Sequence, residues 1–138
     1  MKKTNLLAML LSVSVLLVLI VVQPVSAQGN VQHAFIYCDG KFFHSGETDP
    51  NRNILNVHDD INWHVFGAKG TIVKIDFGAK TPFSQNDFTT TVVNRPPVIR
   101  ATVEHGAAEG EYKYSVTCTP PDGAPWKIDP IIEVPPHP

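Results

Sequence analysis

Beyond residue 27, hydrophobic and polar residues alternate with a period of two along most of the chain. The segment 71–77 shows this pattern most clearly. Its inward residues are Val73, Ile75 and Phe77, and Lys74 lies on the outward face. A period of two is that of a half-buried β-strand, and no apolar pattern with the helical period continues beyond two turns. The pattern therefore predicts an all-β protein.

A second segment, 112–118, alternates in the same way after a turn at Gly110. Its inward residues are expected to be Tyr112, Tyr114, Val116 and Cys118, with Lys113 and Thr117 exposed. We expect these tyrosines and Val116 to form the core together with Trp63 and the inward residues of 71–77.

Other alternating or β-branched segments are bounded by Gly, Pro, Asn and Asp, which favour turns. They predict strands at 31–38, 41–44, 54–57, 61–66, 89–93, 98–103 and 129–134. The strand at 89–93 is expected at a sheet edge because prolines lie close by. About seven strands with frequent turn signals predict an antiparallel Greek-key β-sandwich over residues 31–134, followed by a Pro-rich tail, 135–138.

The first 27 residues differ in composition from the rest of the chain. A basic start precedes an apolar run, 6–22, and then the small residues Val25 and Ala27. This order is typical of a secretory signal peptide. The alternative is a membrane-spanning helix, but no basic flank follows the apolar run. We therefore expect cleavage after Ala27 and a single periplasmic or extracellular domain, 28–138, with no membrane span.

The charge of the processed chain excludes some partners. Because Lys2 and Lys3 leave with the signal, 9 basic residues remain against 13 acidic ones. A net charge of −4, spread along the chain, gives no electrostatic footprint for nucleic acid or for an anionic membrane surface. An envelope protein is one candidate partner, while the sequence leaves the partner and the oligomeric state open.

Two cysteines, Cys38 and Cys118, remain after signal removal. In an exported chain the usual outcome is one disulfide, and the alternative is two buried thiols. A bridge would close a loop of about 80 residues, for which the chain-entropy estimate is about 4–5 kcal/mol. In the strand 31–38, Cys38 shares a face with Ala34 and Ile36, and His33, Phe35 and Tyr37 share the other face.

A Tyr-x-Tyr-x-Val-x-Cys strand at 112–118, a loop and a closing strand resemble the C-terminal half of a cupredoxin, the blue-copper β-sandwich. Ile61-x-Trp63 and the strand ending at Phe77 also resemble parts of such domains. The resemblance covers roughly residues 31–134 and implies a cupredoxin-like fold. It also implies that the first and last strands lie near the Tyr-x-Tyr strand, which would bring Cys38 within reach of Cys118.

The resemblance fails at the metal ligands. Cys118 stands where a cupredoxin has its thiolate, but the next histidine is His137, and both methionines lie in the signal. The segment 81–87, where the family has an upstream ligand, contains no histidine. A disulfide would also remove the thiolate. We therefore expect no type 1 copper site and no intense blue colour on loading with Cu(II).

A different metal site is suggested by His58, Asp60 and His64. In an extended strand these residues would share one face, and imidazole with carboxylate suits weak binding of Cu(II) or Zn(II). The alternative is that they are polar groups on a solvated strand face.

Aromatic residues lie in or beside the expected loops, namely Phe42, Phe43, Phe83, Phe88 and Trp126. They would either mark a partner surface or fold back and cap the core.

The chain contains no Gly-x-Ser-x-Gly and no His-Glu-x-x-His motif. The sequence thus indicates an exported, non-enzymatic binding or structural module of the cell envelope or extracellular space. Metal binding or electron transfer through His58 and His64 is the alternative function.

Overall fold

The computed structural model describes residues 29–44 and 49–136 of the 138-residue chain. Within these ranges every regular element is a β-strand, which confirms the all-β prediction. The described part contains no helix with the length and apolar character needed to cross a membrane. The predicted signal peptide, 1–27, lies outside the described residues, as does the end of the predicted tail.

The strands in the described residues are β1 Val31–Tyr37, β2 Lys41–His44, β3 Arg52–Ile54, β4 Asp60–Phe66, β5 Ile72–Asp76, β6 Asp87–Thr91, β7 Val98–Thr102, β8 Gly110–Lys113, β9 Ser115–Thr119, β10 Trp126–Ile128 and β11 Ile131–Val134. They form three open sheets. The β1 sheet has the order β2-β1-β4-β7, the β5 sheet has the order β10-β9-β5-β6, and the β11 sheet has the order β3-β11-β8. The strand predicted at 89–93 is β6, which lies at a sheet edge as expected.

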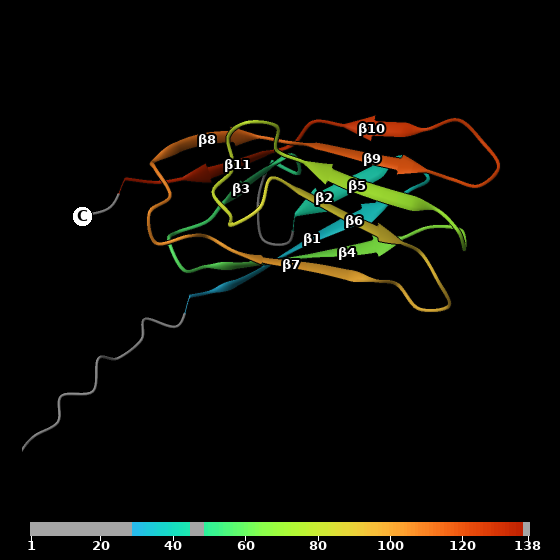
Figure 1. Ribbon diagram of the computed structural model, residues 1–138, viewed down its shortest axis with the longest axis horizontal. Helices are drawn as coiled ribbons and strands as arrows, with labels where there is room; N and C mark the ends of the chain where they lie inside the picture. Colours follow the sequence, from blue (N-terminus) through green and yellow to red (C-terminus); the bar gives the residue numbers. More distant parts are fainter. Residues whose placement is uncertain (1–28, 45–48, 137–138) are drawn as a thin grey trace, which may run out of the picture.

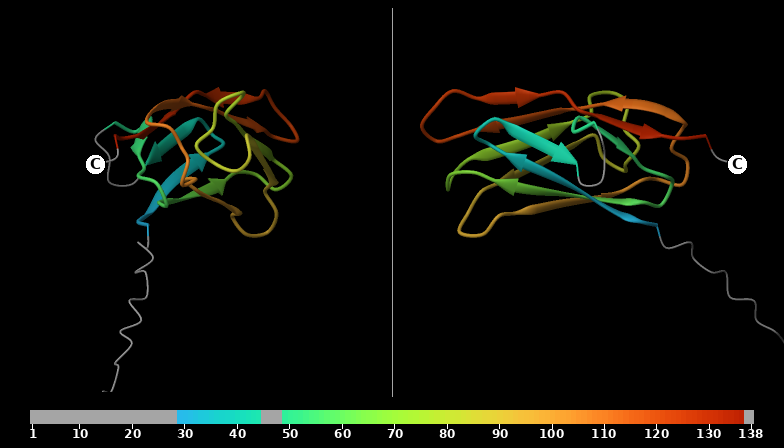
Figure 2. Two further views of the ribbon diagram at one scale, coloured as in Figure 1. Left: turned by 60° about the vertical axis from the view of Figure 1, so that its left-hand side comes forward. Right: turned by 180° about the vertical axis from the view of Figure 1, so that it is seen from behind.

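The sheets lie in two layers, an arrangement consistent with a β-sandwich (Figures 1 and 2). The β1 sheet forms one layer, and the β5 and β11 sheets lie end to end in the other. The chain passes between those two sheets at Tyr114 and again at Pro130. There, the Tyr114 backbone N–H donates to the Pro130 carbonyl at 3.0 Å, so the two long bent strands stay joined through the crossing.

Two pairings are parallel, so the prediction of a purely antiparallel sandwich was wrong. β1 pairs with β4 in parallel, and β11 pairs with β3 in parallel. Alternation along a strand is the same in both pairing modes, so it does not report strand direction. The segment 38–59 between β1 and β4 is long enough for the crossover that parallel pairing requires.

The described residues contain eleven strands, whereas about seven were predicted. The segment 112–118 is split at Tyr114, where the chain changes sheets. The loop predicted after Cys118 is a hairpin connection that leads into β10, where Trp126 is opposite Cys118. The strand predicted at 54–57 lies earlier in the chain, at 52–54. This strand, β3, buries Asn53 and leaves Ile54 exposed.

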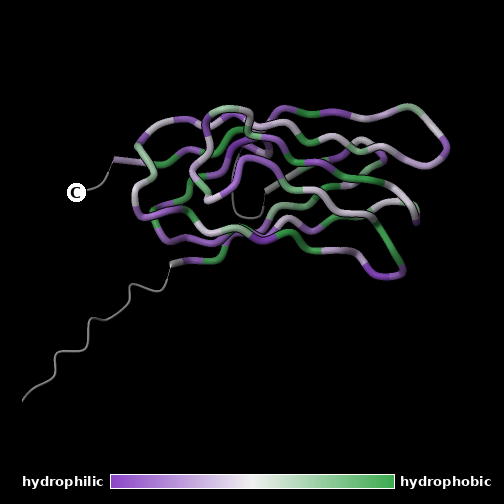
Figure 3. Tube along the Cα trace, viewed as in Figure 1, coloured by the Kyte–Doolittle hydropathy of each residue, from purple (hydrophilic) through white to green (hydrophobic). Residues whose placement is uncertain are grey.

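The core between the layers is centred on Trp63, which is fully buried. Its ring lies 5.6 Å from that of Phe88, 5.7 Å from Phe83 and 6.1 Å from Tyr114. The residues predicted to form the core are all buried: Trp63, Val73, Ile75, Phe77, Tyr112, Tyr114 and Val116. Figure 3 shows the alternation of hydrophobic and hydrophilic residues that produces this core along the strands.

The outward residues of the same strands follow the prediction with one difference. Lys74 and Lys113 are exposed, whereas Thr117 is half-buried. Thr117 lies in register between Lys74 and Lys127 on the adjacent strands, whose long side chains limit its exposure.

The loop aromatics mainly complete the core. Phe42, Phe83 and Phe88 are buried, and the partly buried Trp126 packs against the core cluster. For these four residues the capping interpretation is confirmed. The side chain of Phe43 lies outside the description.

Cys38 and Cys118 form a disulfide, as predicted, with their Cα atoms 5.6 Å apart. Cys38 directly follows β1, and Cys118 lies in β9. The bridge therefore ties one layer of the protein to the other. It also occupies the sulfur that would have been the thiolate ligand of a copper site.

Candidate functional site

The structure does not gather the three predicted metal ligands, His58, Asp60 and His64. Among the described residues, no three His, Cys, Asp or Glu side chains come together as a group that could hold a metal ion. The prediction required an extended chain from 58 to 64. That chain is interrupted because His58 has a φ of 71° and lies in a turn before β4 begins. Asp60 instead accepts a hydrogen bond at 2.5 Å from Thr102 on β7.

The turn at His58 is held by the buried carboxylate of Asp59. This side chain accepts hydrogen bonds from the backbone N–H of Asn30 and of Asn56, each at 2.8 Å. His58 N–H donates to the Val103 carbonyl, and Val103 N–H donates to the Asp59 carbonyl, which ties the turn to the end of β7. Asp59, which was not among the predicted ligands, thus has a structural role.

The His58 ring lies beside His105, a residue that was not part of the predicted site. Nδ1 of His105 and Nε2 of His58 are 3.3 Å apart, and the ring planes are within 19° of parallel. Both side chains are exposed. His105 comes from the loop between β7 and β8, where Ala107 N–H donates to the Glu104 carbonyl.

His64 also has a histidine neighbour, but a different one. Its Nε2 lies 2.8 Å from Nδ1 of His33 on the parallel strand β1. Partial burial lowers the pKa of His64 below its ordinary value of 6.5, and the positive charges of His33 and Arg100 lower it further. The two predicted histidines therefore belong to two separate histidine pairs.

Rings gather on the outward side of β1 and β4, next to the polar residues Asp60 and Asn62 of the same side. Phe35 stacks on His64 with ring centroids 5.0 Å apart, and Tyr37 stacks on Phe66 with centroids 4.7 Å apart. We call these residues, together with His33, the aromatic face. All five are half-buried. Four of the five lie directly opposite one another across the parallel pair, Phe35 with His64 and Tyr37 with Phe66.

The rings of the aromatic face stand upright on the sheet. The centroid distances of 4.7 and 5.0 Å are close to the spacing of neighbouring strands, about 4.8 Å. The planes within each stacked pair are also nearly parallel, at 11° and 15°. The rings therefore pack against each other and present their edges outward. A partner would meet a ridged surface of ring edges here.

The aromatic face ends at a shallow cavity of about 390 Å³ beside the disulfide. Tyr37, Phe66, Cys38 and Pro120 contribute to its lining, as does Thr71. The Thr71 hydroxyl is buried and has no hydrogen-bond partner among the described residues. The cavity therefore adjoins the aromatic face at the end formed by Tyr37 and Phe66.

Comparison with known proteins found no family model that matches this chain and no curated protein that matches it. The functional argument for this protein therefore depends on its own geometry.

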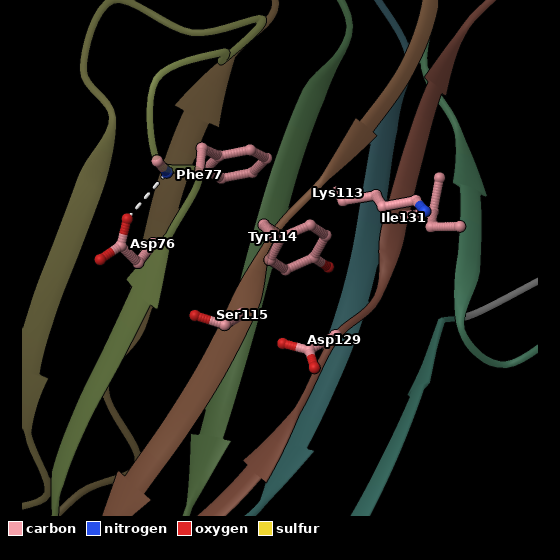
Figure 4. Close-up of a pocket in the computed structure, with 8 residues that line it drawn as sticks. Asp76, Phe77, Lys113, Tyr114, Ser115, Asp129 and Ile131 are labelled. Atoms are coloured by element: carbon pink, nitrogen blue, oxygen red, sulfur yellow. Dashed lines mark hydrogen bonds between the residues drawn. The ribbon is translucent and has the colours of Figure 1, made fainter.

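A larger open cavity of about 590 Å³ lies where the chain changes sheets at Tyr114 (Figure 4). Its floor is formed by Phe77 and Tyr114, whose rings stack with centroids 4.7 Å apart. Asp76 at its rim accepts hydrogen bonds from Lys74 Nζ at 2.7 Å and Gly78 N–H at 2.8 Å. Because this carboxylate is already paired, the cavity offers a weaker case for recognition than the aromatic face.

Two further pKa shifts have structural causes. Hydrogen bonds to Glu111 and Glu133 raise the pKa of Arg52, and these residues form a surface ion-pair network between β3, β11 and β8. Burial raises the pKa of Tyr114, whose hydroxyl accepts a hydrogen bond from the Trp63 indole N–H at 3.3 Å. Neither shift indicates an acid–base catalyst, because ion pairing and burial account for both.

Sequence reasoning did not identify the aromatic face or the two histidine pairs. A signal for the face was present, since His33, Phe35 and Tyr37 alternate on the outward side of the first strand, where polar residues are usual. The partners on β4 depended on the parallel pairing of β1 and β4, which alternation does not encode. His105 had no sequence signal that linked it to His58.

Proposed function

We propose that this chain is an exported, non-enzymatic binding module that recognises its partner through the aromatic face. The observation that carries the proposal is the two stacked ring pairs at half-buried outward positions of β1 and β4. A solvated sheet face ordinarily carries polar residues. Aromatic residues are instead enriched in the centres of protein interfaces, where they supply much of the binding energy.

The surroundings of the aromatic face favour a protein partner with an apolar patch and an acidic border. Val98 on β7 is opposite His64 and is 38% exposed, so it extends the apolar surface. Lys41 is opposite Tyr37, and Arg100 is opposite Asn62, so both cations flank the face. The proposed partner is a protein of the cell envelope or extracellular space.

Export and fold type form part of the same proposal. The disulfide supports export, because structural disulfides persist in oxidising compartments. We propose a Greek-key, cupredoxin-like sandwich. Two contacts of the 112–118 segment support it, and both are contacts that the resemblance implies. The last strand, β11, pairs with β8, and Cys38 at the end of the first strand is bonded to Cys118. The chain also returns from β7 in one layer to pair β9 with β5 in the other.

The test compares capture by the purified protein with capture by two variants, using an extract of the envelope from the source cells. Phe35→Thr with Phe66→Thr removes one ring from each stacked pair, while threonine keeps a high strand propensity. The matched control, Ile72→Thr with Ile54→Thr, removes exposed apolar side chains, 48% and 42% exposed, from β5 and β3, which belong to the other two sheets. We expect the wild type and the control to capture the same protein and the aromatic-face variant to lose it.

Near-ultraviolet circular dichroism of the variants establishes that each remains folded. Equal capture by the aromatic-face variant would overturn the proposal, as would loss of capture in the control alone. Sedimentation of the purified protein checks whether a second copy is the occupant. A dimer that is lost only in the aromatic-face variant would replace the envelope partner with self-association.

A further inference from the structure

The two histidine pairs differ in the separation of their facing nitrogens. In the pair His33 and His64 this separation is 2.8 Å, which is the distance of an ordinary N–H···N hydrogen bond. In the pair His58 and His105 it is 3.3 Å, which is a long and therefore weaker hydrogen-bond distance. Two imidazole nitrogens bound to one tetrahedral Zn(II), each about 2.0–2.1 Å from the metal, lie about 3.3–3.4 Å apart. The second pair therefore has the separation of two zinc ligands.

The backbone holds His58 in a conformation that residues other than glycine uncommonly adopt. Its φ of 71° is the single positive φ among the described non-glycine residues. Such conformations occur where the surrounding structure fixes them, frequently at functional sites. Here Asp59 and the backbone bonds to Val103 fix the turn, so the backbone at His58 is held in place without a ligand.

The environment of the pair is open and contains carboxylates. Both rings are exposed to solvent, so an ion has direct access to the facing nitrogens. The Asp59 carboxylate is buried and used to hold the turn, whereas the exposed Glu104 directly precedes His105 in the chain. The other pair has Arg100 as a charged neighbour, whose positive charge acts on His64 and opposes a cation. Both the separation and the local charge thus favour the His58–His105 pair.

We propose that Nε2 of His58 and Nδ1 of His105 bind one divalent transition-metal ion of tetrahedral preference, with Zn(II) as the representative ion. Two protein ligands leave two positions for water or for groups from another molecule, so this is an open site. The site differs from the predicted one, because His105 takes the place of His64 and Asp60. It lies apart from the aromatic face and does not depend on the proposed function.

The proposal is tested by titrating the purified protein with Zn(II) in competition with a chromophoric chelator. The test variants are His58→Asn and His105→Asn. Asparagine tolerates positive φ, so the turn at position 58 is retained in the first of them. The matched controls are His33→Asn and His64→Asn, which alter the hydrogen-bonded pair in the same way. Circular dichroism and the thermal midpoint without metal establish that each variant is folded.

We expect one Zn(II) per wild-type chain. Loss of a second-shell group alone typically weakens metal binding about 10–100-fold, so each test variant is expected to bind at least about tenfold more weakly. The two controls are expected to keep wild-type affinity. Excess Zn(II) is also expected to raise the thermal midpoint of the wild type and the controls, but not that of the test variants, because the ion binds the folded state.

Absence of binding by the wild type overturns the proposal. Unchanged affinity in both test variants does so too, and loss in the controls would assign the ion to His33 and His64.

Discussion

The outer faces of the two layers cover the same core but have different chemistry. On the β5 sheet the outward residues along one line across the strands are Lys127, Thr117, Lys74 and Thr89. These are the polar and β-branched residues of an ordinary solvated sheet. On the β1 sheet the corresponding outward residues of β1 and β4 are the rings of the aromatic face.

The difference shows that the aromatic face is not required by the fold. Both sheets bury inward residues equally well, as Val73 and Ile75 on β5 and Trp63 and Val65 on β4 are all fully buried. An outward threonine or lysine would satisfy the β1 sheet as it does the β5 sheet. Changes to the shared core and the interlayer disulfide should therefore cost far more stability than changes to either outer face.

The largest expected effect is loss of the disulfide that joins the layers. Cys38→Ala with Cys118→Ala opens a loop with a sequence separation of 80 residues, for which the chain-entropy estimate is about 4–5 kcal/mol. Urea unfolding of the double variant against the oxidised wild type measures this loss. A loss below about 1 kcal/mol would mean that the layers hold together without the bridge and that the loop is restricted in the unfolded chain.

The next effect concerns the core that both layers share. Tyr114 is 2% exposed, stacks on Phe77 and accepts a hydrogen bond from Trp63. Tyr114→Ala is expected to lower the free energy of unfolding by about 3–5 kcal/mol, as for other large buried aromatics. The urea midpoint measures it, with Lys113→Ala on the exposed side of the same bent strand as the control. Equal losses in the two variants would contradict the assignment of inward and outward sides.

Much of the fold was predictable because alternation reports burial directly. The inward residues of 71–77 and 112–118 follow from a period of two, and each is buried in the structure. Strand direction and the switch between sheets were not predictable from this signal. The split at Tyr114 leaves the alternation intact, since Tyr112, Tyr114 and Val116 are all buried across it.

The candidate site was less predictable because it depends on pairing between distant strands. His58 and His64 were recognised as candidates, but an extended chain was assumed where Asp59 builds a turn. The true neighbours, His105 and His33, are brought in by the end of β7 and by the parallel register of β1 with β4. No local spacing in the sequence encodes either approach.

A smaller effect compares single residues on the two outer faces. Phe66 stacks on Tyr37 in the aromatic face, and such ring pairs contribute about 0.5–1.5 kcal/mol beyond area burial. With the lost burial of a half-buried ring added, Phe66→Thr is expected to lower the free energy of unfolding by about 1–3 kcal/mol. Lys74→Thr on the β5 sheet is expected to change it by less than about 0.5 kcal/mol. Urea unfolding of both variants provides the measurement. A greater loss in the Lys74 variant would reverse the comparison.

The smallest effect separates the two faces by pH. The folded-state pKa of His64 is lowered from 6.5 by burial, by His33 and by Arg100, so the unfolded chain binds more protons in the interval between the two pKa values. The free energy of unfolding should then fall as the pH drops through about 6.5 and level off below the folded-state pKa.

On the β5 sheet, hydrogen bonds from Lys74 and from Gly78 lower the pKa of Asp76 from 3.8. Its contribution should be present above that value and lost as the pH falls through its folded-state pKa. Urea unfolding between about pH 3 and pH 8 follows both intervals. His64→Gln should flatten the upper interval alone, and Asp76→Asn the lower interval alone. An upper slope that persists in the His64 variant would show that another histidine carries it and that the aromatic face does not respond to pH through His64.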